Sequence, residues 1–107
     1  MRTFSFGPLL AAGVLLLVCA DPAIAQQVIV VKIADMAFSP ATVTAKVGDT
    51  VEWVNEDFLD HTATAKDEAF DLEIAAGQTR SQRLTKAGTI DYFCRFHPNM
   101  TGTIHVD

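Results

Sequence analysis

Beyond residue 25 the chain has no segment with helical periodicity, only short apolar runs separated by turn-forming residues. Within the runs apolar and polar residues alternate, which puts one side of each strand on a core. Gly48, Gly77 and Gly88 stand at turns between runs. This pattern predicts an all-β fold, a small antiparallel sandwich or barrel of about seven strands. Residues 66–76 fit either a short strand or a loop. The runs cover residues 28–33, 42–47, 50–54, 61–65, 79–84, 89–94 and 101–106.

The first 25 residues have the pattern of a secretory signal peptide. Arg2 supplies a positive charge, residues 9–20 are apolar, and Ala23-Ile24-Ala25 forms an A-x-A cleavage site. The apolar run is short for a membrane span. We therefore predict a cleaved signal peptide over residues 1–25, a mature domain over residues 26–107, and a soluble periplasmic protein. The alternatives are a lipoprotein signal at Cys19, which the preceding Val18 disfavours, and a retained N-terminal anchor.

Size and charge limit what the mature chain does. A chain of this length forms one small domain with a thin core. The net charge of −5 disfavours nucleic acid as a partner. Eight acidic residues lie between residues 52 and 73. They are either ordinary solvated side chains or an acidic flank that steers a basic partner.

Four residues form a candidate metal site. Cleavage would leave Cys94 as the only cysteine, without a partner for an internal disulfide. His97 and Met100 follow it in the pattern C-x-x-H-x-x-M, and His61 lies far upstream in another strand. Two imidazoles, a thiolate and a weak thioether are the ligand set of a blue-copper electron-transfer site. Zinc is the main chemical alternative, but structural zinc sites usually use more cysteines and no thioether.

Each candidate ligand also has a purely structural explanation. Met100 could fill a gap in the core, Cys94 could be an inert buried thiol, and the two histidines could be loop residues. Their combination beside a single thiol favours the metal site. His105 is different, because it alternates with the apolar residues of its strand, so we expect it at the surface and not at the site.

Longer stretches of the sequence resemble the cupredoxins, most closely the amicyanins and more loosely the plastocyanins and pseudoazurins. The segments that carry the resemblance are Met36-Ala37-Phe38-Ser39-Pro40, G-D-T-V-x-W-x-N at residues 48–55, His61, and C-x-x-H-P-x-M-x-G-x-I-x-V at residues 94–106. The resemblance implies a Greek-key β-sandwich of seven to eight strands. It also implies one type 1 copper ion held by His61, Cys94 and His97, with Met100 as the axial ligand and Asn55 as a residue that braces the ligand loop.

The function implied by the resemblance is electron transfer and not enzymatic catalysis. One copper ion would cycle between Cu(I) and Cu(II) in a monomeric carrier. Its partners would be redox proteins such as a c-type cytochrome or a periplasmic dehydrogenase. The alternative is a copper-binding protein for delivery or storage. The chain has few spare Met or His residues, which disfavours that alternative.

One position departs from the pattern of the family. The residue directly before the second histidine, usually proline, is Phe96, whose backbone N–H could donate to the Cys94 sulfur. Phe96, Pro98, Met36 and Leu59 are also expected to form an apolar rim around the outer edge of His97, suited to brief docking.

Overall fold

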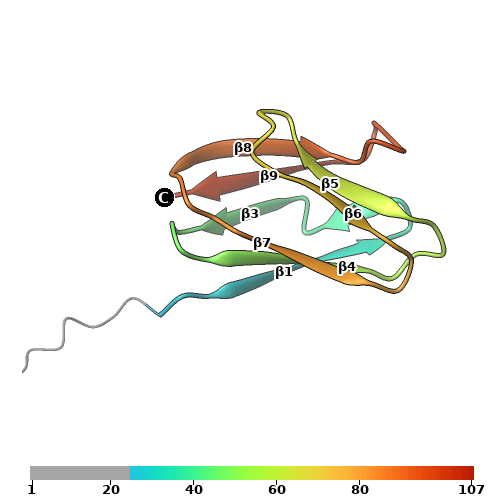
Figure 1. Cartoon of the computed structure of the whole chain (residues 1–107), viewed down its shortest axis with the longest axis horizontal. Coiled ribbons are helices and arrows are strands. Elements are labelled where there is room, and N and C mark those ends of the chain that lie inside the picture. Colours follow the sequence, from blue (N-terminus) through green and yellow to red (C-terminus); the bar gives the residue numbers. More distant parts are fainter. Residues whose placement is uncertain (1–24) are drawn as a thin grey trace, which may run out of the picture.

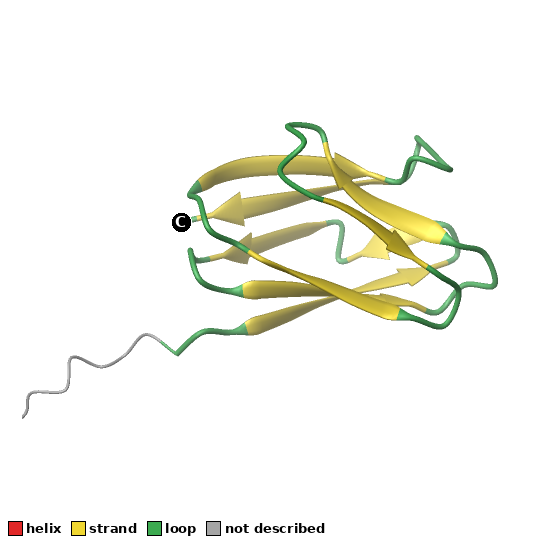
Figure 2. Ribbon diagram, viewed as in Figure 1, coloured by secondary structure: helices red, strands yellow, loops and turns green. Residues whose placement is uncertain are grey.

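A computed structural model describes residues 25–107, so the predicted signal peptide over residues 1–25 lies outside the described residues except for Ala25. The described part consists of nine strands and the loops between them (Figures 1 and 2). It holds no helix long and apolar enough to cross a membrane. The strands are β1 (Val28–Ala34), β2 (Ala37–Ser39), β3 (Thr42–Ala45), β4 (Thr50–Asn55), β5 (His61–Ala65), β6 (Asp71–Ile74), β7 (Thr79–Arg83), β8 (Gly88–Phe93) and β9 (Thr101–Val106).

Two sheets pack face to face, in the strand orders β2-β1-β4-β7 and β3-β9-β8-β5-β6. The predicted all-β sandwich is therefore confirmed. The described residues form nine strands, whereas the sequence pattern predicted about seven. The two additional strands are β2, which is three residues long and was not predicted, and β6, which is four residues long and was left open as a strand or a loop. The prediction of an antiparallel sandwich is wrong for two strand pairs. β1 pairs with β4, and β3 with β9, in parallel.

The core lies between the sheets and contains the side chains that the alternation predicted. Val51 and Trp53 are fully buried from β4, and Tyr92 from β8. The Tyr92 ring meets the Phe38 ring edge-on, with centroids 4.7 Å apart, and the Trp53 ring at 5.5 Å. Burial raises the pKa of Tyr92 to about 12, so its hydroxyl stays neutral. His105 is exposed between buried neighbours, as expected.

The topology brings two distant segments to one end of the molecule. β5 begins at His61, and β8 ends at Phe93, directly before Cys94. The two strands are antiparallel neighbours, with Thr64 opposite Phe93. The loop before β5 and the loop between β8 and β9 therefore lie at the same end of the sandwich (Figure 1, right). All four candidate ligands belong to these two segments.

Candidate metal centre

Three of the four predicted ligands converge on one point. The Sγ atom of Cys94 lies 3.7 Å from Nδ1 of His61 and 3.8 Å from Nδ1 of His97. All three donor atoms lie within 4.8 Å of one another, and no other group of three His, Cys, Asp or Glu side chains in residues 25–107 has this arrangement. His61 and Cys94 are fully buried, whereas His97 is partly exposed. The site thus has a closed inner side and an outer histidine.

These separations fit a single metal ion. Zinc, whose bond lengths serve as a guide for a first-row metal, lies about 2.0 Å from an imidazole nitrogen and about 2.3 Å from a thiolate sulfur. When the angle at the metal is near 120°, those two donors are about 3.7 Å apart. The distances of 3.7 and 3.8 Å agree with that arrangement. Two imidazoles and a thiolate around a trigonal centre are the strong ligands of a blue-copper site.

Backbone hydrogen bonds within the loop between β8 and β9 determine its shape. The N–H of His97 donates to the carbonyl of Cys94 (3.2 Å), and the N–H of Met100 donates to the carbonyl of His97 (2.8 Å). The N–H of Cys94 donates to the carbonyl of Met100 (3.0 Å), which closes the loop. Met100 is itself buried. Its thioether as the axial ligand stays a prediction.

A hydrogen bond from β5 reaches the Cys94 sulfur, at 3.3 Å from the backbone nitrogen of Thr62. The donor expected from the sequence was the N–H of Phe96. Among residues 25–107, the backbone N–H that donates to Sγ is that of Thr62, and no hydrogen bond joins the Phe96 N–H to Sγ. The hydroxyl of Thr62 also accepts the N–H of Arg95 (2.8 Å). Thr62 directly follows the ligand His61, and its two hydrogen bonds join it to Cys94 and to Arg95. It therefore holds the His61 segment against the Cys94 segment. No pattern in the sequence pointed to Thr62.

The far side of the His61 ring faces a carboxylate. Oδ2 of Asp57 lies 2.8 Å from Nε2 of His61. Burial by itself would raise the pKa of Asp57, but hydrogen bonds from the N–H of Met36, from His61 and from the N–H of Asp35 outweigh it and lower that pKa below its ordinary value. Asp57 is thus an anion in contact with a buried candidate ligand. No motif in the sequence distinguished it from the other acids of its loop.

Asn55 braces the segment that carries His61. Its side-chain N–H groups donate to the carbonyls of Leu59 (2.8 Å) and Ile74 (3.0 Å), and its Oδ1 accepts the N–H of Asp57 (2.9 Å). None of these bonds reaches residues 94–100. The bracing that the resemblance implied for Asn55 therefore acts on the loop between β4 and β5, while Thr62 contacts the cysteine loop.

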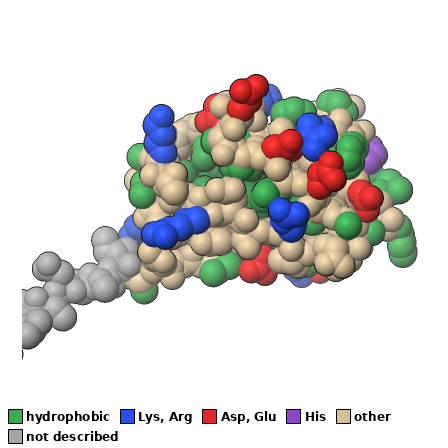
Figure 3. Space-filling model, viewed as in Figure 1, with side chains coloured by type: hydrophobic (Ala, Val, Ile, Leu, Met, Phe, Trp, Pro, Cys, Tyr) green, Lys and Arg blue, Asp and Glu red, His purple; other side chains and the backbone are tan. Residues whose placement is uncertain are grey.

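Three of the eight acidic residues in the run form ion pairs with Lys or Arg side chains. Arg95 bonds Asp71 at 3.0 Å and Glu73 at 3.3 Å, which fastens the start of the ligand loop to β6. Glu56 lies 3.8 Å from Lys32. Both acidic and basic side chains lie on the face seen in Figure 3. These pairs offset part of the negative charge of the run.

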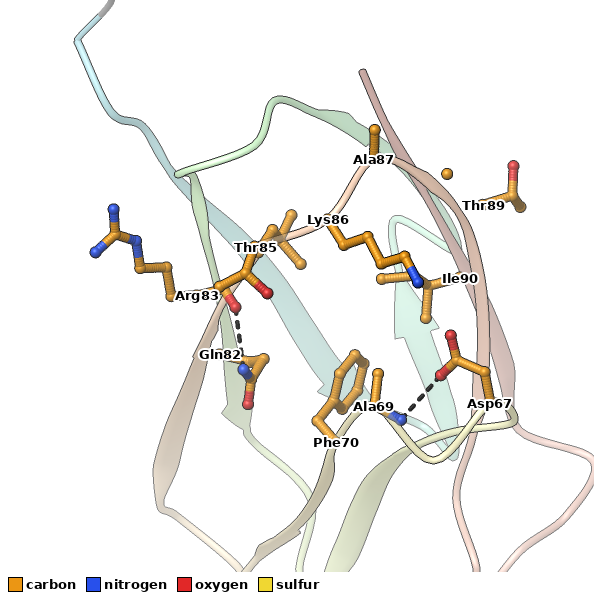
Figure 4. A pocket seen from close by; sticks show the side chains of 12 residues that line it. Asp67, Ala69, Phe70, Gln82, Arg83, Thr85, Lys86, Ala87, Thr89 and Ile90 are labelled. Atoms are coloured by element: carbon orange, nitrogen blue, oxygen red, sulfur yellow. Dashed lines mark hydrogen bonds between the residues drawn. The ribbon is translucent and has the colours of Figure 1, made fainter.

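Apolar side chains surround the outer histidine. Met36, Phe96 and Pro98 line a hollow of about 350 Å³ with His97. Leu59 and Phe58 are exposed on the loop before β5, and Phe58, which the sequence analysis did not single out, is fully exposed. A second hollow, of about 150 Å³, lies at the other end of β8 beside Asp67, Phe70 and Lys86 (Figure 4). It is remote from the candidate ligands.

The sandwich with its His-Cys-His cluster defines a class of copper protein, and comparison with known proteins agrees. A family model described as the cupredoxin-like domain matches residues 8–106. The chain belongs to the cupredoxin family, and its cofactor is one copper ion. No curated protein sequence matches the chain.

Several solved structures of amicyanin are similar to this chain. A reduced-state amicyanin mutant is 37% identical over 75% of this chain and 82% of its own, with a TM-score of 0.67. A Cu(I) form of another amicyanin mutant is 35% identical over 79% and 87%, with a TM-score of 0.68. The Cu-containing nitrite reductase NirK from Thermus scotoductus SA-01 is 31% identical over 74% of this chain, with a TM-score of 0.69. The match covers only 22% of that enzyme.

Proposed function

We propose that this protein is a periplasmic electron carrier in which His61, Cys94 and His97 hold one type 1 copper ion and Met100 is the weak axial ligand. The observation that carries the proposal is the trio of donor atoms at 3.7 and 3.8 Å, two of them fully buried. When bound, copper supplies a reversible one-electron couple. A closed set of soft and borderline ligands suits both of its oxidation states.

The chain's own residues determine how such a site works. The loop hydrogen bonds and the Thr62 N–H hold the sulfur in place, so little has to move when the charge changes. His61 and Cys94 lie on the buried side, which keeps water from the inner ligands. His97 is the partly exposed ligand and is the proposed point of electron entry and exit.

The apolar rim around His97 supports the kind of partner proposed. Met36 and Phe96, which line the hollow beside His97, are 40% and 47% exposed, and Leu59 on the loop before β5 is 52% exposed. A small apolar patch rimmed by polar residues is typical of brief contacts between redox proteins. We propose a c-type cytochrome or a periplasmic dehydrogenase as the partner, a monomeric carrier, and a mature domain that starts at Gln26 after signal cleavage. No substrate chemistry is assigned to it.

The experiment that tests this proposal is spectroscopic and electrochemical. Cu(II) added to the mature chain should produce an intense blue thiolate-to-copper absorption and a reversible one-electron voltammogram. Cys94→Ala should abolish the colour, while the exposed-histidine variant His105→Ala should keep it. A colourless wild-type complex, or a blue Cys94→Ala complex, contradicts the proposal. Rapid loss of Cu(I) to a competing chelator, without a reversible couple, would favour copper delivery instead.

A further inference from the structure

We propose that Asp57 is a positioning residue for the copper site: its carboxylate holds the His61 imidazole by Nε2–H, keeps Nδ1 free for the metal, and lowers the reduction potential. This inference rests on the proposed function. Asp57 would act through His61 and would not touch the metal.

The first observation is the position of the His61 ring between two partners. Nε2 lies 2.8 Å from Oδ2 of Asp57, and Nδ1, on the other side of the ring, lies 3.7 Å from Sγ of Cys94. The ring is fully buried, so water does not compete for either nitrogen. A carboxylate only accepts hydrogen bonds, so Nε2 carries the proton and Nδ1 keeps its lone pair. A metal requires that tautomer at Nδ1.

The second observation is that the carboxylate is itself held. The N–H of Asp35 donates to Oδ1 (2.8 Å), and the N–H of Met36 donates to Oδ2 (3.1 Å). Both residues have positive φ, 52° and 62°, which turns their N–H groups toward one acceptor. Successive backbone N–H groups of this kind form a concavity for an anion. The Asp57 side chain is only 16% exposed, so it is not a freely moving surface acid.

A fixed anion behind a ligand changes the balance between the two copper oxidation states. A carboxylate bonded to a metal-binding histidine raises the basicity of that ligand. Its negative charge also attracts the more highly charged ion more strongly. Both effects favour Cu(II) over Cu(I), so Asp57 lowers the potential. Removal of the Asp57 carboxylate should therefore raise the reduction potential.

Asp57→Asn is the test, and Glu56→Gln is the matched control. Both variants remove one acidic charge from the same loop, but Glu56 points to Lys32 and not to His61. Loss of a partner of a ligating histidine typically costs 10–100-fold in metal affinity. We expect that loss mainly for Cu(II). Each tenfold loss of affinity for Cu(II) relative to Cu(I) raises the reduction potential by about 59 mV. We expect Glu56→Gln to stay close to wild type.

A second readout follows the bond directly. In the diamagnetic Cu(I) protein, the Nε2 proton of His61 should exchange slowly with solvent in wild type and faster in Asp57→Asn. If Asp57→Asn fails to fold, the wild-type exchange rate alone remains decisive, and fast exchange there overturns the inference. If the wild type is blue and the two variants Glu56→Gln and Asp57→Asn shift the reduction potential equally, the inference is also overturned. A wild type that is not blue contradicts the proposed function instead.

Discussion

At the residue scale, Thr62 joins the two ligand-bearing segments. Its N–H donates to the sulfur of Cys94 and its hydroxyl accepts the N–H of Arg95. Thr62 is fully buried, and the hydrogen bond from its N–H to the sulfur is buried as well. The backbone bond depends only on the fold, but the hydroxyl bond depends on the amino acid. A substitution at this position can therefore separate the two.

Thr62→Val keeps the shape of the side chain and removes its hydroxyl. The N–H of Arg95 then loses its acceptor, and an unpaired group of this kind costs about 1–3 kcal/mol. We expect the free energy of unfolding of the copper-free protein, measured by urea denaturation, to fall by that amount. Thr44→Val is the control, because Thr44 is exposed on β3 and its change should stay within about 0.5 kcal/mol. Equal effects from both variants would show that the hydroxyl bond contributes nothing.

At the element scale, the pair β8–β9 determines where the cysteine loop begins and ends. Tyr92 pairs with Gly102 across the two strands. A Cβ atom at residue 102 would overlap Cζ and Oη of the Tyr92 ring. The ring cannot retreat, since it packs edge-on against Phe38 and Trp53. The absence of a side chain at Gly102 is thus a packing requirement of the core that supports the loop.

Gly102→Ala should therefore be strongly destabilising. Overpacking of a filled core usually costs about 1–3 kcal/mol and sometimes more. We expect a loss at or above the top of that range in urea denaturation, together with a broadened blue absorption band. Gly77→Ala is the control, because residue 77 has open space around it and only an unfavourable φ of 76°. That variant should lose about 1 kcal/mol. If Gly102→Ala lost no more than Gly77→Ala, the packing argument would be wrong.

At the scale of the whole molecule, the site belongs to one sheet. β5 and β8 are neighbours in the five-stranded sheet, and the ligand loop connects β8 to β9 in the same sheet. The hydrogen bonds within the loop and from Thr62 join protein groups to one another. Copper therefore adds to a site that the protein already organises, and it stabilises the folded state by binding to it preferentially.

Copper should accordingly raise the melting temperature without being required for folding. At a free copper concentration of 100 times the dissociation constant, the stabilisation is about 2.7 kcal/mol. For a domain of this size that corresponds to roughly 10–20 °C, measurable by scanning calorimetry of the mature protein with and without copper. The melting temperature of Cys94→Ser, which lacks the thiolate, should rise much less when copper is added. Identical melting of the copper-loaded and copper-free wild type would contradict the linkage.

Some features of this protein follow from its sequence because they depend on neighbouring residues. Alternation within single strands predicted the inward face that buries Trp53 and Tyr92. The spacing of Cys94, His97 and Met100 confined three candidate ligands to one short loop, and residue chemistry indicated copper. The three-residue strand β2 was missed because so short a run carries no period.

Other features were decided only by tertiary structure. The parallel pairing of β1 with β4 arises because the chain leaves the four-stranded sheet for β3 and returns to it at β4, a path that no local pattern encodes. The donor to the sulfur is Thr62 and not Phe96, because the register of β5 beside β8 brings together residues 32 apart in the chain. In the sequence, nothing distinguishes Asp57 from the other seven acids of the run, and only the folded loop shows its contact with His61. A hydrogen bond requires correct distance and direction, and for residues far apart in sequence only the folded chain supplies both.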